Sequence, residues 1–118
     1  MTETAARMNQ GKPQLEFVLD FPIAAEGIAR VMEIGGIKYD IDNWKKGGKP
    51  DSEYLGAAMR HLFAHKAGEL FAPDSGCLHL AHAAWNLLAL IELNVRQTHD
   101  PDKFAEMCEY WRLQKKNS

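Results

Sequence analysis

The chain has 118 residues, which fits a single domain, and its 46% hydrophobic and 25% charged residues are typical of globular proteins. Its formal net charge of −2 argues against a general nucleic-acid-binding surface, because phosphate contacts require concentrated lysine and arginine. The longest apolar run, residues 83–93, is too short to span a membrane, and the sequence does not begin with an apolar signal segment. We therefore expect a soluble intracellular protein.

The first third of the chain is predicted to hold one long helix. Residues 1–12 are polar and aperiodic, so we expect a mobile tail ahead of a single all-helical domain over residues 13–118. Residues 15–19 are expected to form a short extended lead-in. The first helix is then predicted from about residue 21 to residue 39, with Asp20 as its N-cap.

A loop rich in glycine and lysine, residues 40–50, separates this helix from a second one. The second helix is predicted from a cap at Asp51 or Ser52 to about Phe71, just before Pro73. Its apolar residues recur at helical spacing and are expected to face the core: Leu55, Met59, Leu62, Phe63 and Leu70.

The turn residues 74–76 lead into a third helix, predicted over about residues 78–96. This helix is apolar nearly all round, which is typical of a helix in the middle of a bundle. Asp100-Pro101 is expected to cap and open a fourth helix. Because no segment alternates with a period of two, the sequence predicts an all-α, four-helix bundle-like arrangement whose second and third helices form an antiparallel central pair.

Polar side chains interrupt the apolar third helix on one face. His79, His82 and Asn86 are spaced i, i+3 and i+7 and therefore lie along a single stripe. Burying such groups without hydrogen bonds costs about 1–3 kcal/mol each, so all three need partners. The stripe is explained either by hydrogen-bonded core histidines or by a working site.

The second helix offers partners for this stripe. Its own polar stripe has the spacing i, i+4 and i+8 and consists of His61, His65 and Glu69. Folding the two helices antiparallel is expected to bring Glu69 beside His79 and His82, and to bring His61 towards the Asn86 end. Imidazole and carboxylate groups that face each other across a bundle are typical of metal sites, so the sequence predicts a divalent-metal or catalytic site here.

Carboxylates near this helix pair are further candidates. Asp74 lies in the connecting turn. On the first helix, Glu26, Arg30 and Glu33 form either a solvent-exposed salt-bridge ladder or, in the case of Glu33, a further carboxylate turned towards the site. The sequence leaves both interpretations open.

The segment after the first helix has the residue types that bind a nucleotide. Lys38 and the loop lysines suit phosphate, Tyr39 and Trp44 could stack on a base, and Asn43 could pair with a purine edge. A solvated loop with a packed tryptophan is the alternative. Arg60 is a stronger anion-binding candidate, because it lies beside His61 in the sequence.

Several short motifs follow one another along most of the chain. In order they are Gly11-Lys12-Pro13-x-Leu15, Gly35-x-x-Lys38-Tyr39, Asn43-Trp44-x-x-Gly47, Arg60-His61-Leu62, Gly68-Glu69 and His79-Leu80-Ala81-His82-Ala83. Together, over about residues 11–95, they resemble the phage-associated dATP/dGTP diphosphohydrolase domain, a MazG-like branch of the all-α nucleotide pyrophosphohydrolases. The ordered set is more specific than any single motif.

The resemblance implies a metal-dependent hydrolase that acts on phosphoric anhydrides. The expected substrate is a purine deoxynucleoside triphosphate, dATP or dGTP, which is cleaved between its α- and β-phosphates to the monophosphate and pyrophosphate. The resemblance also implies Mg²⁺ or Mn²⁺ as the cofactor and assembly into a homo-oligomer, while composition favours neither stable nucleic-acid binding nor a membrane partner. The expected location is the cytoplasm, which is that of the host if a phage encodes the chain.

Phosphoryl transfer depends on charge neutralisation and a positioned water, which suggests roles for the matching residues. The expected catalytic residues are Glu69, His61 and His79. The expected metal ligands are Glu33, Glu69, Asp74 and His82, and the expected substrate-binding residues are Lys38, Tyr39, Asn43, Trp44 and Arg60. One departure from the wider MazG-like group is that its acidic pair of metal-binding blocks, ExxE followed by ExxD, does not occur in this sequence.

Two other functions stay open. The chain could be a non-catalytic module that binds a nucleotide in the same pocket. It could also be an HD-type dNTP triphosphohydrolase, because His99-Asp100 is similar to the metal-binding dipeptide of HD phosphohydrolases, although Asp100 is already explained as a helix cap. The phosphate product separates these functions, since an HD-type enzyme would release tripolyphosphate or inorganic phosphate rather than pyrophosphate.

Overall fold

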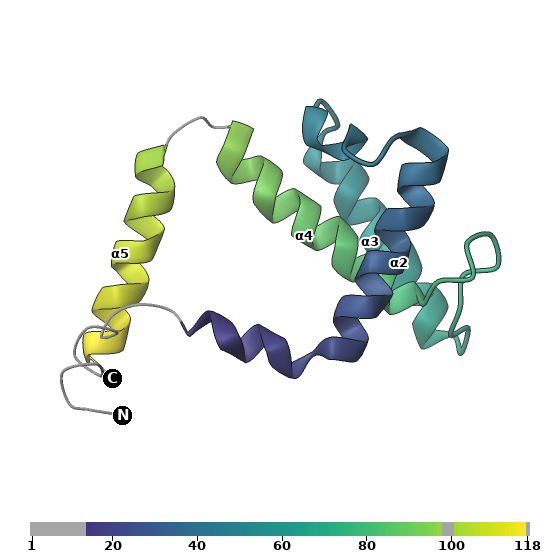
Figure 1. Ribbon diagram of the computed structural model, residues 1–118, viewed down its shortest axis with the longest axis horizontal. Helices are drawn as coiled ribbons and strands as arrows, with labels where there is room; N and C mark the ends of the chain where they lie inside the picture. Colours follow the sequence, from purple (N-terminus) through teal and green to yellow (C-terminus); the bar gives the residue numbers. More distant parts are fainter. Residues whose placement is uncertain (1–13, 98–100, 118) are drawn as a thin grey trace.

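The computed structural model describes residues 14–97 and 101–117, and these residues form an all-α arrangement, as predicted (Figure 1). The elements in chain order are η1 (Leu15–Asp20), α2 (Pro22–Tyr39), η2 (Asn43–Lys46), α3 (Asp51–Lys66), α4 (His79–Gln97) and α5 (Pro101–Asn117). Within the described ranges, extended pairing is limited to an isolated antiparallel bridge between Phe71 and Leu78. The predicted tail, residues 1–12, and the predicted cap at Asp100 lie outside the described residues.

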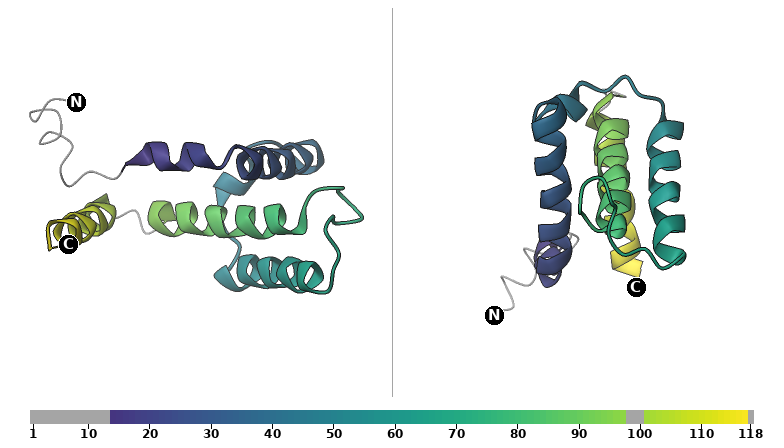
Figure 2. Two further views of the ribbon diagram at one scale, coloured as in Figure 1. Left: turned by 90° about the horizontal axis from the view of Figure 1, so that it is seen from below. Right: turned by 90° about the vertical axis from the view of Figure 1, so that its right-hand side faces the viewer.

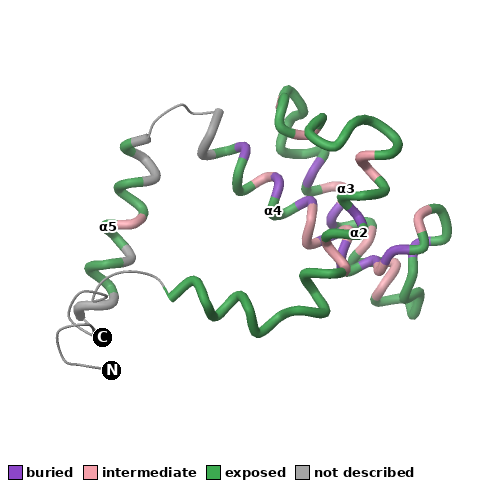
Figure 3. Tube along the Cα trace, viewed as in Figure 1, coloured by how far each residue is buried: buried purple, intermediate pink, exposed green. Residues whose placement is uncertain are grey.

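Helix α4 lies between α2 and α3, and most of the buried residues belong to it or pack against it (Figures 2 and 3). Helix α3 runs antiparallel to α4: Tyr54 near its start packs against Ala89 and Leu93, while His61 further along reaches His79. The predicted antiparallel central pair is therefore confirmed. Helix α5 continues from the far end of α4 and stands apart from α2 and α3 (Figure 1).

The packed surfaces of these helices carry small side chains. The buried residues of the described chain are Val31, Tyr54, Ala58, Ala72, Cys77, His79, Ala81, Ala83, Asn86, Ala89 and Leu93. A Cβ atom added to Gly27 would lie 3.3 Å from Cβ of Ala81, so glycine and alanine set the close approach of α2 to α4. None of the large side chains in the described ranges is fully buried.

Three local predictions were wrong. Residues 15–19 belong to the 3₁₀-helix η1 rather than to an extended lead-in. The N-cap of α2 is Phe21 rather than Asp20, and no side-chain hydrogen bond caps the helix. Helix α3 ends at Lys66 rather than near Phe71, because Gly68 adopts a φ of 102° that only glycine tolerates readily.

The predicted core face of α3 was also wrong. Its buried residues are Tyr54 and Ala58, and the half-buried His61 and His65 continue the same face. The apolar residues expected to form the core are exposed instead: Leu55, Met59, Leu62, Phe63 and Leu70. The physical reason is that α3 approaches α4 along small and hydrogen-bonding side chains, which leaves the neighbouring apolar face outward. No helix in the described part of the chain is long and apolar enough to cross a membrane.

Candidate functional site

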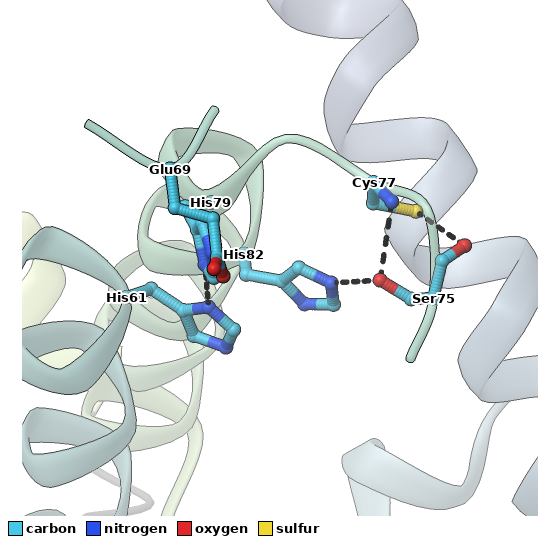
Figure 4. Close-up of polar contacts among 6 residues, drawn as sticks. All are labelled: His61, Glu69, Ser75, Cys77, His79 and His82. Carbon is cyan, nitrogen blue, oxygen red and sulfur yellow. Dashed lines mark hydrogen bonds and ion pairs between the residues drawn. The ribbon is translucent and has the colours of Figure 1, made fainter. Parts of the chain in front are cut away.

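The segment between α3 and α4 folds back over the start of α4 (Figure 4). The backbone N–H of Ala72 donates to the backbone oxygen of Cys77 at 2.8 Å, and the backbone N–H of His79 donates to the backbone oxygen of Leu70 at 3.0 Å. This tight connection carries Glu69 and Ser75 to the histidines of α3 and α4. Glu69 therefore reaches the site from a loop, and not from the extension of α3 that its spacing suggested.

A chain of two short hydrogen bonds links Glu69, His79 and His61. Nε2 of His79 lies 2.6 Å from Oε1 of Glu69, and its Nδ1 lies 2.8 Å from Nδ1 of His61. A carboxylate can only accept, so Nε2 of His79 carries a proton, and with His79 neutral its Nδ1 accepts from Nδ1–H of His61. Nε2 of His61 is then left with a free lone pair. His79 is buried, with 5% of its surface exposed, so packing around its ring holds these two hydrogen bonds in place.

The third histidine, His82, lies flat against His61. Their ring centroids are 4.4 Å apart with an interplanar angle of 6°. Nε2 of His82 is hydrogen-bonded to Oγ of Ser75 at 2.7 Å, and this oxygen accepts the backbone N–H of Cys77 at 3.1 Å. We call these five side chains the histidine cluster: His61, Glu69, Ser75, His79 and His82 (Figure 4).

Electrostatics keep two imidazoles of the histidine cluster neutral. The pKa of His61 is lowered chiefly by burial and further by the neighbouring His82 and His79. Burial is also the main cause that lowers the pKa of His82. Both rings therefore stay neutral near pH 7, with one N–H and one nitrogen lone pair each, and a proton acceptor in catalysis requires such a lone pair.

Asp74 places a negative charge within electrostatic range of this cluster. Its carboxylate opposes the lowering of the pKa of His61 and of His82, and it contributes to a raised pKa of Lys38. The main cause of the Lys38 shift is a hydrogen bond to Tyr39, whose ring centroid lies 5.1 Å from the ammonium. Asp74, Lys38 and Tyr39 are all exposed, so this end of α2 offers a cation and an aromatic ring near the site.

The register of the two polar stripes differs from the prediction in one respect. His61 contacts His79 and His82 rather than facing the Asn86 end. Asn86 is buried and donates to the backbone oxygen of His82 on its own helix at 2.8 Å, so it is a satisfied core residue. His65 has a buried Nδ1 that makes no hydrogen bond within the described residues.

The predicted substrate-binding residues are scattered. Trp44 packs edge-on against Trp85, with centroids 6.4 Å apart and an interplanar angle of 81°, and joins the core cluster of Tyr54. Asn43 is exposed in η2. Arg60 is exposed on α3, and its guanidinium lies back over Gly56 on the preceding turn.

The predicted metal ligands are not brought together. Glu33 is exposed on α2, where the neighbouring Glu26 and Arg30 form an exposed ion pair at 3.5 Å. Among residues 14–97 and 101–117, no group of three or more His, Cys, Asp or Glu side chains is arranged to hold a metal ion. In the histidine cluster the bonded nitrogens of His79 and His82 point at protein partners, and Mg²⁺ prefers oxygen ligands. The donor set therefore does not fit a resident metal in this arrangement.

Ser75 is the residue of the cluster that the sequence interpretation missed. It was treated only as part of a turn, although a hydroxyl at the end of a loop that returns to a histidine helix is a ready partner for imidazole. His82 needed such a partner, and Ser75 lies seven residues before it in the sequence. That requirement was the available signal.

Comparison with known proteins identifies the family. Residues 2–103 match the family model described as "dATP/dGTP diphosphohydrolase, N-terminal". A dATP/dGTP diphosphohydrolase of Salmonella phage PMBT28 is 32% identical over 103 residues, which cover 86% of this chain and 34% of the phage protein. The chain thus spans about a third of the length of that relative, and no solved structure matches it significantly. The chain belongs to the dATP/dGTP diphosphohydrolase family, whose N-terminal domain it matches.

Proposed function

We propose that this chain is a nucleotide pyrophosphohydrolase that converts dATP or dGTP to the monophosphate and pyrophosphate. The observation that carries the proposal is the hydrogen-bonded chain from Glu69 through His79 to His61, which leaves a lone pair on Nε2 of His61. A neutral imidazole aligned by a carboxylate is a competent general base for water. Family membership supplies the substrate class.

Substrate binding is assigned to groups around the histidine cluster. Phosphoryl transfer requires positioning and neutralisation of charge rather than covalent chemistry. Lys38 and Arg60 supply cations for the polyphosphate, and the exposed ring of Tyr39 is the surface on which the base stacks. Asn43, exposed in η2, is assigned to the base edge from its residue type alone. Trp44 is given no role in binding because its ring packs in the core.

The proposed reaction depends on Mg²⁺ or Mn²⁺, which we place with the substrate rather than in a protein cage. Magnesium is commonly held by one or two carboxylates together with the phosphates of its nucleotide. Asp74 is exposed and its charge reaches the cluster, so it is the carboxylate assigned to the incoming metal–nucleotide complex. The protein residues then bind and orient this complex against His61.

Exposed apolar side chains support a homo-oligomer. We expect it to act in the cytoplasm, which is that of the host if the gene is carried by a phage. The outward face of α3 presents Leu55, Met59, Leu62 and Phe63 to solvent, with Phe63 67% exposed. A contiguous apolar face of this kind is typical of an interface. A second copy of the chain is the partner that we propose for it.

The deciding experiment is a nucleotide panel with product analysis. The purified chain is incubated with each deoxynucleoside triphosphate and with ATP and GTP, in Mg²⁺, in Mn²⁺ and in EDTA. The proposal expects dAMP or dGMP with equimolar pyrophosphate, and expects EDTA to abolish turnover. Tripolyphosphate or inorganic phosphate as the first product would instead indicate an HD-type reaction. Calorimetric binding of dATP or dGTP without turnover would indicate a non-catalytic nucleotide-binding module.

A further inference from the structure

Two imidazole nitrogens of the histidine cluster make no hydrogen bond within the described residues. They are Nε2 of His61 and Nδ1 of His82, on two rings stacked 4.4 Å apart. We propose that Ser75 is a positioning residue that holds His82 as a hydrogen-bond donor on the ring stacked against His61. The stacked pair then binds a water on one ring and a phosphoryl oxygen on the other. This inference rests on the proposed function for the identity of the ligand.

The partners of Ser75 decide which nitrogen of His82 carries the proton. Oγ of Ser75 accepts the backbone N–H of Cys77 at 3.1 Å, which leaves its own proton to be donated. The acceptor within reach is Nε2 of His82 at 2.7 Å. If Nε2 instead donated to Ser75, the hydroxyl proton would have no described acceptor. A neutral imidazole has one N–H, so that of His82 lies on Nδ1.

The other ring of the pair has the opposite hydrogen-bonding character at its unbonded nitrogen. His61 donates through Nδ1 to His79, which in turn donates to Glu69, so Nε2 of His61 can only accept. Both rings carry their proton on Nδ1, yet His61 presents a lone pair and His82 presents an N–H. The difference arises because their protein partners, His79 and Ser75, bind different nitrogens.

This pairing matches the needs of hydrolysis at phosphorus. The water oxygen forms a bond to the α-phosphorus while one of its protons passes to Nε2 of His61. The bond from the α-phosphorus to the bridging oxygen breaks, and pyrophosphate leaves with the electron pair. Nδ1–H of His82 donates to a non-bridging oxygen, which gains negative charge as the water attacks.

The test reads the tautomers directly from the full chain without nucleotide. Nitrogen-15 NMR of the histidine side chains at about pH 7.5 distinguishes an N–H nitrogen from one with a lone pair. In the unaltered chain we expect His61 and His82 to be protonated on Nδ1 and His79 on Nε2. Protonation of His82 on Nε2 would overturn the inference, whatever the activity of the protein.

Three variants sharpen this test. Ser75→Ala is expected to move the proton of His82 to Nε2, the form that free histidine favours in water, and to leave His61 unchanged. Ser75→Thr keeps the hydroxyl and is expected to keep the tautomer. Ser52→Ala removes an exposed serine at the start of α3 and is the matched control. An unchanged His82 signal in a folded Ser75→Ala chain would also overturn the inference, and the signals of the unaltered chain decide the question if that variant does not fold.

Kinetics separate a positioning role from a structural one. With dATP or dGTP, Ser75→Ala is expected to lower kcat by roughly ten- to a hundredfold with little change in KM, because the N–H of His82 acts on the transition state. A rise in KM at unchanged kcat would contradict this role. If the unaltered chain hydrolyses no nucleotide, the proposed function fails, while the NMR result still decides whether Ser75 sets the tautomer of His82.

Discussion

Oε1 of Glu69 lies 2.6 Å from Nε2 of His79, although Glu69 follows the end of α3 and His79 begins α4. The contact closes the loop between the two helices and aligns a buried imidazole with an exposed carboxylate. His79 passes this alignment to His61 through its other nitrogen. The orientation of the proposed base thus depends on a residue that lies two hydrogen bonds away from it.

Replacing Glu69 by glutamine tests this dependence. The amide that the substitution introduces can present its N–H₂ to His79, which would reverse the proton order along the hydrogen-bonded chain and remove the lone pair from Nε2 of His61. We expect Glu69→Gln to lower kcat by about a hundredfold or more while the thermal midpoint changes little, because the Glu69 side chain is 51% exposed. Steady-state kinetics with dATP and dGTP measure the effect.

The matched control for that variant is Glu26→Gln. Glu26 is exposed on α2 and pairs only loosely with Arg30, at 3.5 Å, so its loss is expected to leave kcat unchanged. Equal activity of Glu69→Gln and Glu26→Gln would show that the carboxylate of Glu69 has no part in the reaction.

The stability of the chain is expected to fall as the pH drops below about 6.5. Burial lowers the pKa of His61 and of His82 from 6.5 in the folded chain. His82, His79 and Arg60 lower the pKa of His61 further, His79 does the same for His82, and Asp74 opposes the shift in both cases. Between the lowered values and 6.5 the unfolded chain binds more protons than the folded chain, so the free energy of unfolding rises with pH in this window. Urea unfolding at about pH 7.5 and about pH 5.5 measures this difference.

Histidine titrations followed by NMR provide the control for the pH prediction. His61 and His82 are expected to titrate below 6.5, in contrast to the unfolded chain in urea. If both residues titrate at or above their ordinary pKa, burial does not disfavour their charged forms, and any loss of stability in acid has another origin.

The sequence predicted the topology better than it predicted the contacts. Helical periodicity and a short turn are local properties, so they led to the antiparallel α3–α4 pair and to Glu69 as a partner of His79. The core face of α3 was misassigned because apolar spacing alone cannot reveal which face approaches α4. The close approach runs along Ala58, which is small, and His61, which is hydrogen-bonded, and it leaves Leu62 outside.

Loop geometry was the other part that the sequence did not reveal. The reversal after Gly68 makes His61 face His79 instead of Asn86 and brings Ser75 onto His82. Both outcomes depend on backbone angles in residues 67–78, which periodicity does not describe. The role of Trp44 was mispredicted for a similar reason. Its residue type indicated that it could stack on a base, but its packing on Trp85 depends on the backbone path of η2.

Gly68 is expected to be essential to this reversal. Its φ is 102°, and a Cβ placed there would meet no atom within 4 Å, so alanine would introduce backbone strain without a steric clash. We expect Gly68→Ala to lower the free energy of unfolding by about 1–2 kcal/mol. Gly35→Ala is the matched control, because Gly35 also has open space around it but lies inside α2. Alanine there is expected to stabilise by about 1 kcal/mol. Urea unfolding that gave both variants the same sign would contradict the role of Gly68.

The outward face of α3 provides the test of assembly. Leu55, Met59, Leu62 and Phe63 share this face, and burying an exposed apolar side chain of this size stabilises an interface by about 1.5–3 kcal/mol. We expect the chain to elute as an oligomer in size-exclusion chromatography with light scattering, and Phe63→Glu to shift it to a monomer. Lys46→Glu introduces the same acidic residue in η2 rather than on α3 and is expected to leave the oligomer intact. If the unaltered chain elutes as a monomer, the proposal of a homo-oligomer is wrong. If the oligomer persists in Phe63→Glu, its interface lies on another surface.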